Sequence, residues 1–178
     1  MLLIQLTGLS GSGKTTIARL TKEKLATRNI NLEVIDGDEY RKTISKGLGF
    51  SYDDRVENLR RLGFVGKLLL KHGVISIVSA INPFESVRRE LSESSNSVKT
   101  VWINCSLETL IKRDPKGLYK RALLPDDHSD KLFQFTGVND LYEKPVLPDL
   151  ILNTDQETPD ESSNRLVEFI LNQIDSVK

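Results

Sequence analysis

The sequence is poor in cysteine, has no surplus of either charge and contains no long apolar run. A single cysteine among 178 residues excludes a disulfide within the chain and suits a reducing compartment. Because Cys105 follows the apolar run Val101–Ile103, we expect a buried structural thiol there rather than a nucleophile. Lysine plus arginine and aspartate plus glutamate number 25 each, so the chain has no overall field to recruit nucleic acid or an acidic membrane.

Signals for export and membrane insertion are also missing. No apolar run approaches the ~20 residues of a membrane-spanning helix. An apolar strand that begins at Leu2 leaves no room for a signal peptide. We therefore expect a cytoplasmic protein with neither membrane nor nucleic-acid partners. The length suits one α/β domain over residues 1–178 and is short for two.

Short apolar segments alternate with segments of helical periodicity. The predicted strands are Leu2–Thr7, Leu32–Asp36, Val74–Ser79, Thr100–Asn104 and Leu150–Leu152. The predicted helices are Thr16–Arg28, Asp54–Lys71, Phe84–Glu93, Leu107–Arg113 and Pro159–Val177. The last begins with a capping box formed by Thr158 and Glu161. This alternation predicts an α/β fold with a parallel sheet and helices on both faces.

Residues 8–15 match the phosphate-loop pattern G-x-x-x-x-G-K-[S/T] between a predicted strand and a predicted helix. Glycines let backbone N–H groups converge on a phosphate at the positive end of the following helix. Lys14 would reach the β- and γ-phosphates, and the Thr15 hydroxyl would ligate Mg²⁺. A plain glycine-rich turn is disfavoured because strand, loop and helix follow in the required order. The chain is predicted to bind a nucleotide.

Two carboxylates end the second predicted strand, where an open parallel sheet faces its ligand. Asp36 and Asp38, with the slim Gly37 between them, can serve Mg²⁺ and an acceptor hydroxyl. Alternatively the segment is a turn in which Asp38 acts as a helix N-cap. The pattern alone leaves both interpretations open.

Further polar groups follow. Arg41 lies one helical turn beyond Asp38 and projects from the same side. Arg55, Asn58 and Arg61 form a stripe that can face ligand or solvent, solvent being the commoner fate. The polar segment Asp114–Lys144 has no periodicity and is predicted to be a lid or binding loop.

A series of segments, in one order, resembles the adenylylsulfate kinase family over roughly residues 2 to 154. They are Gly8–Thr16, Asp36–Arg41, Gly47–Ser51, Asp54–Arg61, Arg113–Lys120, Phe135–Gly137 and Tyr142–Glu143. That family transfers the γ-phosphoryl group of MgATP to the 3′-hydroxyl of adenosine 5′-phosphosulfate. The resemblance implies a five-stranded P-loop kinase core with a lid, ATP and Mg²⁺ as cofactors, a homodimer, and an ATP sulfurylase as a candidate partner.

The resemblance also implies roles for individual residues. The implied catalytic residues are Asp38, Lys14 and Asp36, with Asp38 as the base or the carboxylate that orients the acceptor hydroxyl. The implied ATP-binding residues are Gly8, Leu9, Ser10, Gly11, Ser12, Gly13, Lys14, Thr15 and Thr16, with Arg113 and Lys116 closing from the lid. The implied acceptor-binding residues are Asp38, Arg41, Phe50, Arg55, Asn58 and Phe135. Guanidinium forks suit the phosphosulfate, and the two phenylalanines would stack on the adenine.

The chain departs from the family pattern after the third strand. The family commonly has Ile-Ser-Pro there, and its serine has been proposed as a phosphorylated intermediate. This chain has Asn82, which cannot accept a phosphoryl group, so direct transfer from ATP is expected.

The lid departs as well. Leu123 replaces an arginine, residues 124–130 form an insert, and Phe133 replaces a lysine for which Lys131 could substitute. Fewer lid cations should weaken ATP closure or acceptor binding. His128, inside the insert, has no ligand-spaced partner and is expected to be solvated.

Two other functions remain open. The first is a kinase of the same fold acting on another hydroxylated nucleotide or small metabolite, which the altered lid motivates. The second is a weakly active nucleotide-binding domain with a regulatory role, against which the intact Lys14, Thr15, Asp36 and Asp38 argue. A GTPase switch is disfavoured because no Asn-Lys-x-Asp motif is present.

Overall fold

The computed structural model describes residues 1–175 and contains a five-stranded sheet with the order β2-β3-β1-β4-β5. The strands, all paired in parallel, are β1 Leu3–Thr7, β2 Leu32–Asp36, β3 Ile75–Ser79, β4 Val98–Asn104 and β5 Leu150–Asn153. The helices are α1 Lys14–Ala26, α2 Gly37–Tyr40, α3 Tyr52–Lys71, α4 Glu85–Glu93, α5 Leu107–Arg113, α6 Leu118–Ala122 and α7 Pro159–Asp175. The predicted α/β class is confirmed.

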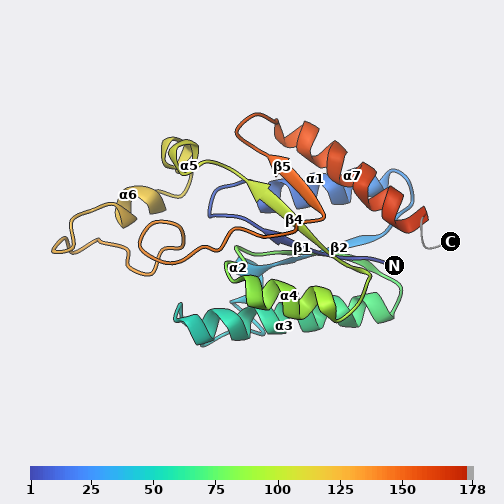
Figure 1. The fold of residues 1–178 in the computed structure, drawn as a ribbon, viewed down its shortest axis with the longest axis horizontal. Helices are drawn as coiled ribbons and strands as arrows, with labels where there is room; N and C mark the ends of the chain where they lie inside the picture. The colour runs from blue at the N-terminus through green and yellow to red at the C-terminus, as the bar shows by residue number, and fades with distance from the viewer. Residues whose placement is uncertain (176–178) are drawn as a thin grey trace.

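The central strand β1 lies between two helical layers (Figure 1), and its side chains alternate between them. Ile4 and Leu6 of β1 belong to a buried cluster with residues of α1 and α7. Leu3, which points the other way, packs in a second cluster with Leu62 of α3. The sheet is therefore covered on both faces, with α1 and α7 on one side and α3 and α4 on the other.

Several predicted boundaries are wrong by one or two residues, for local reasons. The first helix begins at Lys14 rather than Thr16, because Gly13 takes the cap position with a φ of 99°. It ends at Ala26 rather than Arg28. The third helix begins at Tyr52 rather than Asp54, because the Ser51 hydroxyl accepts a hydrogen bond from the Asp54 amide and caps it.

Predictions for the C-terminal helix are largely confirmed. Pro159 is its first residue, and the Thr158 hydroxyl accepts a hydrogen bond from the Glu161 amide at 3.2 Å. The Glu161 carboxylate accepts one in return from the Thr158 amide at 2.8 Å, which completes the capping box. The predicted end at Val177 lies outside the described residues.

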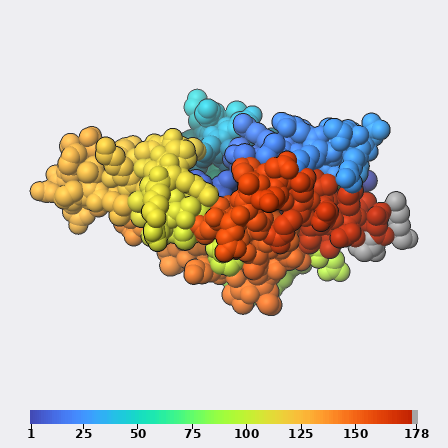
Figure 2. Space-filling model, turned by 90° about the horizontal axis from the view of Figure 1, so that it is seen from above, coloured from blue at the N-terminus to red at the C-terminus, as the bar shows by residue number. Residues whose placement is uncertain are grey.

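The chain between β4 and β5 extends beyond the sheet. Figure 1 shows α5, α6 and the loop that follows them on the side away from both termini, and Figure 2 shows the same segment as a protrusion. Its short helix α6 is absent from the sequence prediction, which treats residues 114–144 as irregular. Within residues 1–175, no helix combines the length and apolar character needed to cross a membrane.

Candidate active site

A cavity of about 280 Å³ opens where β1, β2 and β3 end. Predicted residues that line it are Ser10, Gly11, Gly13, Lys14, Thr15, Thr16, Asp36, Asp38, Arg41, Phe50, Arg55, Asn58 and Lys116. Predicted residues that do not line it are Gly8, Leu9, Ser12, Arg113 and Phe135. Segments far apart in the sequence thus meet at the carboxyl end of the sheet, as expected for this class of fold.

The phosphate loop is built by close backbone contacts. A Cβ atom at Gly8 would lie 2.5 Å from the carbonyl oxygen of Ile103, so only glycine fits there. The buried ammonium of Lys14 donates to the carbonyl oxygens of Gly8 and Leu9 at 2.8 and 2.7 Å. Burial lowers the pKa of Lys14 to about 8, and Asp38 partly opposes this shift.

Because the pKa of Lys14 is lowered, we expect nucleotide binding to depend on pH. Below pH 8 the ammonium is charged in the free protein, and bound phosphates would keep it charged to higher pH. Above pH 8, nucleotide binding should therefore be accompanied by the uptake of a proton. The affinity for the nucleotide should be highest below pH 8 and should fall as the pH rises. Calorimetric titration with a non-hydrolysable ATP analogue, in two buffers of different ionisation enthalpy at pH 8.5, measures this uptake. The Lys14→Ala variant should show none, and a wild-type protein without proton uptake would contradict the assignment.

Asp36 links the phosphate loop to the short helix α2. One carboxylate oxygen accepts a hydrogen bond from the Thr15 hydroxyl at 2.7 Å. The other accepts from the backbone amides of Asp38 and Glu39 and caps α2. The interpretation of Asp38 as the N-cap is therefore wrong, since Asp36 takes that position and leaves the Asp38 carboxylate free of backbone bonds.

The oxygen atoms beside Thr15 suit a magnesium ion. The Ser79 hydroxyl lies 3.4 Å from the Thr15 hydroxyl, so two hydroxyls and the Asp36 carboxylate converge. Mg²⁺ prefers hard oxygen ligands and usually takes few from the protein when substrate phosphates supply the rest. Residues 1–175 contain no group of three or more acidic, histidine or cysteine side chains able to hold a metal. Sequence reasoning missed Ser79, although it ends the third strand at the same edge.

Asp38 faces the root of the lid. Its carboxylate accepts a hydrogen bond from the Lys116 ammonium at 2.9 Å, and both side chains are more than half exposed. An ion pair this exposed contributes about 0–1 kcal/mol to stability. The contact places the Lys116 ammonium beside the exposed Asp38 carboxylate.

The opposite wall of the cavity carries two guanidinium groups around an exposed aromatic ring. The Cζ atoms of Arg41 and Arg55 lie 4.6 and 5.8 Å from the centroid of Phe50. Burial, and then the positive charge of Arg55, lower the pKa of Arg41. An anion bound between the two groups would relieve that repulsion, so this wall favours a negatively charged ligand.

The stripe predicted on the third helix divides between ligand and solvent. Arg55 and Asn58 are buried and line the cavity, so solvent is the wrong interpretation for these two. Arg55 also pairs with Asp140 at 3.0 Å and donates to Gln134 and Thr136 of the lid. The Asn58 Oδ1 atom is buried and has no hydrogen-bond partner among the described residues.

Phe135 and Arg113 lie apart from the cavity. Phe135 is 8% exposed, packs edge-on against Tyr119 with centroids 4.9 Å apart, and does not line the cavity that Phe50 lines. Arg113 donates to the Thr154 carbonyl at 2.6 Å. Sequence reasoning missed the Tyr119 hydroxyl, which donates to the Ser10 carbonyl at 2.8 Å and joins the lid to the phosphate loop.

The lid residues that depart from the family pattern do not line the cavity. Lys131 pairs with Asp126 at 3.3 Å and donates to the Leu124 carbonyl, both within or beside the insert. Phe133 and Leu123 are each more than half exposed, and His128 is exposed as expected.

Elsewhere, Cys105 is buried as predicted, and that burial raises the pKa of its thiol.

Comparison with known proteins agrees with the geometry. A model of the adenylylsulphate kinase family matches residues 1–153. An adenylyl-sulfate kinase of Gloeothece citriformis is 45% identical over 164 residues, which cover 92% of this chain and 90% of that protein. A Sorangium cellulosum protein named "Probable bifunctional SAT/APS kinase 2" is 40% identical over 161 residues, covering 90% of this chain and 27% of that protein.

Similarity extends to solved structures. The Mycobacterium tuberculosis APS kinase CysC, solved in complex with AMPPNP and APS, superposes with a TM-score of 0.87 and 35% sequence identity. The superposition covers 95% of this chain and 96% of that one. The likeness therefore includes the sheet, the helices and the lid together.

Proposed function

This chain belongs to the adenylylsulphate kinase family, and on that premise we propose that it transfers the γ-phosphoryl group of ATP to the 3′-hydroxyl of adenosine 5′-phosphosulfate. The observation that carries the proposal is one cavity with two unlike walls. Lys14 and Thr15 line its phosphate-binding wall, Arg41 and Phe50 line its anion-binding and aromatic wall, and Asp38 lies at the same cavity. A phosphoryl donor and an anionic nucleotide acceptor therefore have separate places beside one carboxylate.

Lys14 and the loop amides account for the donor side. The ammonium would leave the carbonyl oxygens of Gly8 and Leu9 and follow the γ-phosphate as charge develops on it. A magnesium ion bound with ATP would supply further charge compensation, with Thr15, Asp36 and Ser79 as the oxygen-bearing residues near it. These residues bind and orient the phosphates, which is most of what phosphoryl transfer requires.

Asp38 accounts for the acceptor side. Because its carboxylate is not used as a cap, it can accept a hydrogen bond from the acceptor's 3′-hydroxyl and then its proton. Arg41, Arg55 and Asn58 would hold the phosphosulfate. Asn82 lines the cavity where the family commonly has serine, and its amide cannot carry a phosphoryl group. Transfer is therefore direct from ATP to the acceptor.

A panel of acceptors tests the reaction. Full-length protein with MgATP should phosphorylate adenosine 5′-phosphosulfate in preference to AMP, because the sulfate adds a contact to the guanidinium wall. ADP release and the mass of the product measure this. Equal use of both acceptors, or turnover of neither, would favour the second candidate, a kinase of the same fold with another hydroxylated acceptor. The altered lid is the observation that keeps that candidate open.

Two phenylalanine variants separate stacking from packing. Phe50→Ala should raise the acceptor KM by an amount worth ~1–3 kcal/mol, with little change in stability because the ring is 58% exposed. Phe135→Ala should destabilise the protein by about 3–5 kcal/mol, because its ring packs against Tyr119. Acceptor KM and thermal denaturation distinguish these effects. An unchanged KM for a folded Phe135 variant would remove that ring from the adenine clamp, which stays a prediction.

Assembly and location extend the proposal. We expect a homodimer, as the family resemblance implies, and the Sorangium protein's printed name makes an ATP sulfurylase a reasonable partner to test. Light scattering of the purified chain measures its oligomeric state. The cytoplasmic location, expected from the single cysteine, stays a prediction.

A further inference from the structure

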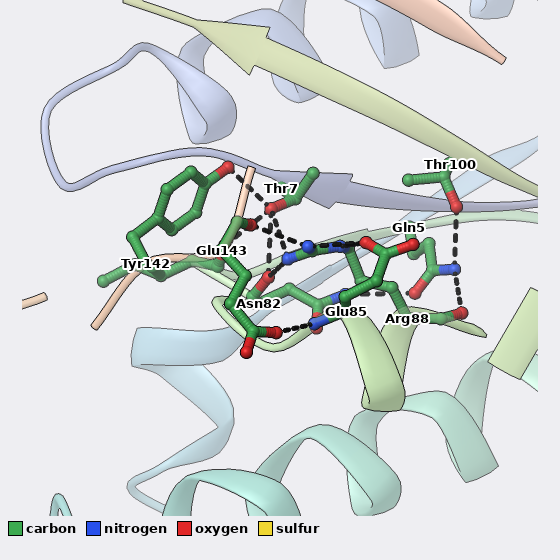
Figure 3. Close-up of polar contacts among 9 residues, drawn as sticks. Gln5, Thr7, Asn82, Glu85, Arg88, Thr100, Tyr142 and Glu143 are labelled. Carbon is green, nitrogen blue, oxygen red and sulfur yellow. Dashed lines mark hydrogen bonds and ion pairs between the residues drawn. The ribbon is translucent and has the colours of Figure 1, made fainter. Parts of the chain in front are cut away.

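A fully buried guanidinium lies behind residues 81–83, which line the cavity. Arg88 of α4 is 1% exposed, and its only charged partner among the described residues is Glu85, at 2.7 Å. Its Nη1 atom donates to the Asn82 carbonyl at 2.5 Å, and its Nη2 atom donates to the Glu143 carbonyl at 2.7 Å (Figure 3). One planar group therefore joins the loop after β3 to the end of the lid.

The loop after β3 needs such support because its conformation is unusual. Asn82 has a φ of 46°, in the left-handed region, and residues 81–83 line the cavity. Thr7 donates to the carbonyl oxygens of Ile81 and Asn82 at 3.1 and 3.0 Å from the other side. Thr7 directly precedes the phosphate loop, so the two walls of the cavity are connected here.

The orientation of the Asn82 side-chain amide is set by its hydrogen bond to the side-chain amide of Gln5. Gln5 donates from Nε2 to the Arg88 carbonyl at 2.8 Å and to Thr100 at 2.9 Å, so its Oε1 must accept. The Asn82 Nδ2 atom donates to that oxygen at 3.0 Å. The Asn82 Oδ1 atom is left buried without a partner among residues 1–175, as is Oδ1 of Asn58. Both residues line the cavity, although these two oxygen atoms are themselves covered by the protein.

The returning end of the lid is held at the same junction. The Glu143 amide donates to the Pro83 carbonyl at 2.9 Å, and its carboxylate accepts from the Glu85 amide at the start of α4. The Tyr142 hydroxyl lies 2.9 Å from the Thr7 hydroxyl. Figure 3 shows these side chains converging on Arg88 from the first strand, the fourth helix and the lid.

We propose that Arg88 is a positioning residue that locks the cavity wall at residues 81–83 to the returning end of the lid. The inference rests on the proposed function. Arg88 does not line the cavity, and its effect would reach the acceptor through the carbonyl groups of Asn82 and Glu143. Losing it removes the side-chain donor of the Glu143 carbonyl and one of the two side-chain donors of the Asn82 carbonyl, which keeps Thr7. The partly exposed Glu85 carboxylate loses its ion pair as well, so the wall and the lid end would relax apart.

Kinetics of Arg88 variants test the inference. Arg88→Met should raise the KM for adenosine 5′-phosphosulfate about tenfold or more, because the Glu143 carbonyl loses its side-chain donor and the Asn82 carbonyl loses one of two. The Kd for a non-hydrolysable ATP analogue, measured without acceptor, should change less than about threefold, because Lys14 and its loop are untouched. Arg88→Lys should recover part of the loss, since an ammonium can hold some of these oxygens but lacks the planar fork. Arg89→Met is the matched control, because Arg89 is exposed and pairs only loosely with Glu93 at 3.6 Å.

A milder variant protects the test from misfolding. Tyr142→Phe removes only the hydroxyl that meets Thr7 and should raise the acceptor KM by about two- to fivefold. Hydrogen exchange of the Glu143 amide should be faster in both Arg88 and Tyr142 variants, since that amide is held at the junction.

A folded Arg88→Met protein with wild-type acceptor KM would overturn the inference. So would an ATP-analogue Kd that weakens as much as the acceptor KM rises. If Arg88→Met does not fold, wild-type acceptor KM in both Arg88→Lys and Tyr142→Phe overturns it. A wild-type protein inactive on adenosine 5′-phosphosulfate would instead count against the proposed function, before any variant is made.

Discussion

Lys14→Ala should lower kcat by about two to three orders of magnitude, because it removes the cation that accompanies the γ-phosphate through the transition state. The fold should survive. The ammonium is buried, and burial lowers its pKa to about 8, so the charge is held at a cost that alanine does not bear. The melting temperature at pH 7 should therefore stay level or rise. Steady-state kinetics and thermal denaturation of the same preparation measure both effects.

Lys22→Ala is the control for this variant. Lys22 lies on the same helix, pairs with Glu33 at 2.9 Å and is close to half exposed, so its loss should leave kcat unchanged. A Lys14→Ala protein that retains most of its activity would remove Lys14 from the mechanism. It would also leave the ammonium bonds to Gly8 and Leu9 as a purely structural feature.

Asp38→Asn is expected to give the second large loss. The amide keeps the size of the carboxylate but cannot take the proton of the acceptor hydroxyl, a role usually worth about 10²- to 10⁴-fold in rate. kcat should fall by that order while the acceptor KM changes little, which is the pattern of an interaction made in the transition state. Stability should not change, because Asp36 and not Asp38 caps α2.

Glu39→Gln is the matched control for Asp38→Asn. Glu39 is the next residue on α2, is exposed and does not line the cavity. An Asp38→Asn protein with wild-type kcat would place the base elsewhere. Loss of the Lys116 ion pair cannot mimic the expected effect, because so exposed a pair is worth at most about 1 kcal/mol.

The features that the sequence predicted correctly are those set by residues close together in the chain. The five strands and the phosphate loop follow from residues adjacent in the chain, and the structure agrees with the fold class they predict. The helices α2 and α6 were missed because four or five residues are too few for a periodic pattern. Their stability comes from the carboxylates of Asp36 and Asp114, which accept from backbone amides at their first turns.

Contacts between distant segments could not be predicted in the same way. Arg55 and Asn58 form a polar stripe that suggests solvent, yet the lid and the strand ends enclose both. Phe135 was placed by family resemblance at the adenine, but a lid can hold its side chains in more than one arrangement. In this structure Phe135 completes a cluster with Tyr119 and Leu110. The contacts of Arg88 join residues 82 and 143, and no spacing in the sequence predicts that these residues meet.

The two oxygens of Asp36 limit what mutagenesis can learn at that position. One oxygen organises the turn that carries Asp38, and the other receives the Thr15 hydroxyl. Replacing the carboxylate by an amide offers an N–H to one of these neighbours, whichever way the group is turned. A low kcat of the Asp36→Asn variant would therefore have two possible causes, a displaced Asp38 carboxylate or a disturbed phosphate loop. Thr15→Val removes only the hydroxyl contact of Asp36, and Asp38→Asn changes the acceptor carboxylate while the Asp38 backbone amide still binds Asp36. The two contributions are therefore separable through the neighbours of Asp36.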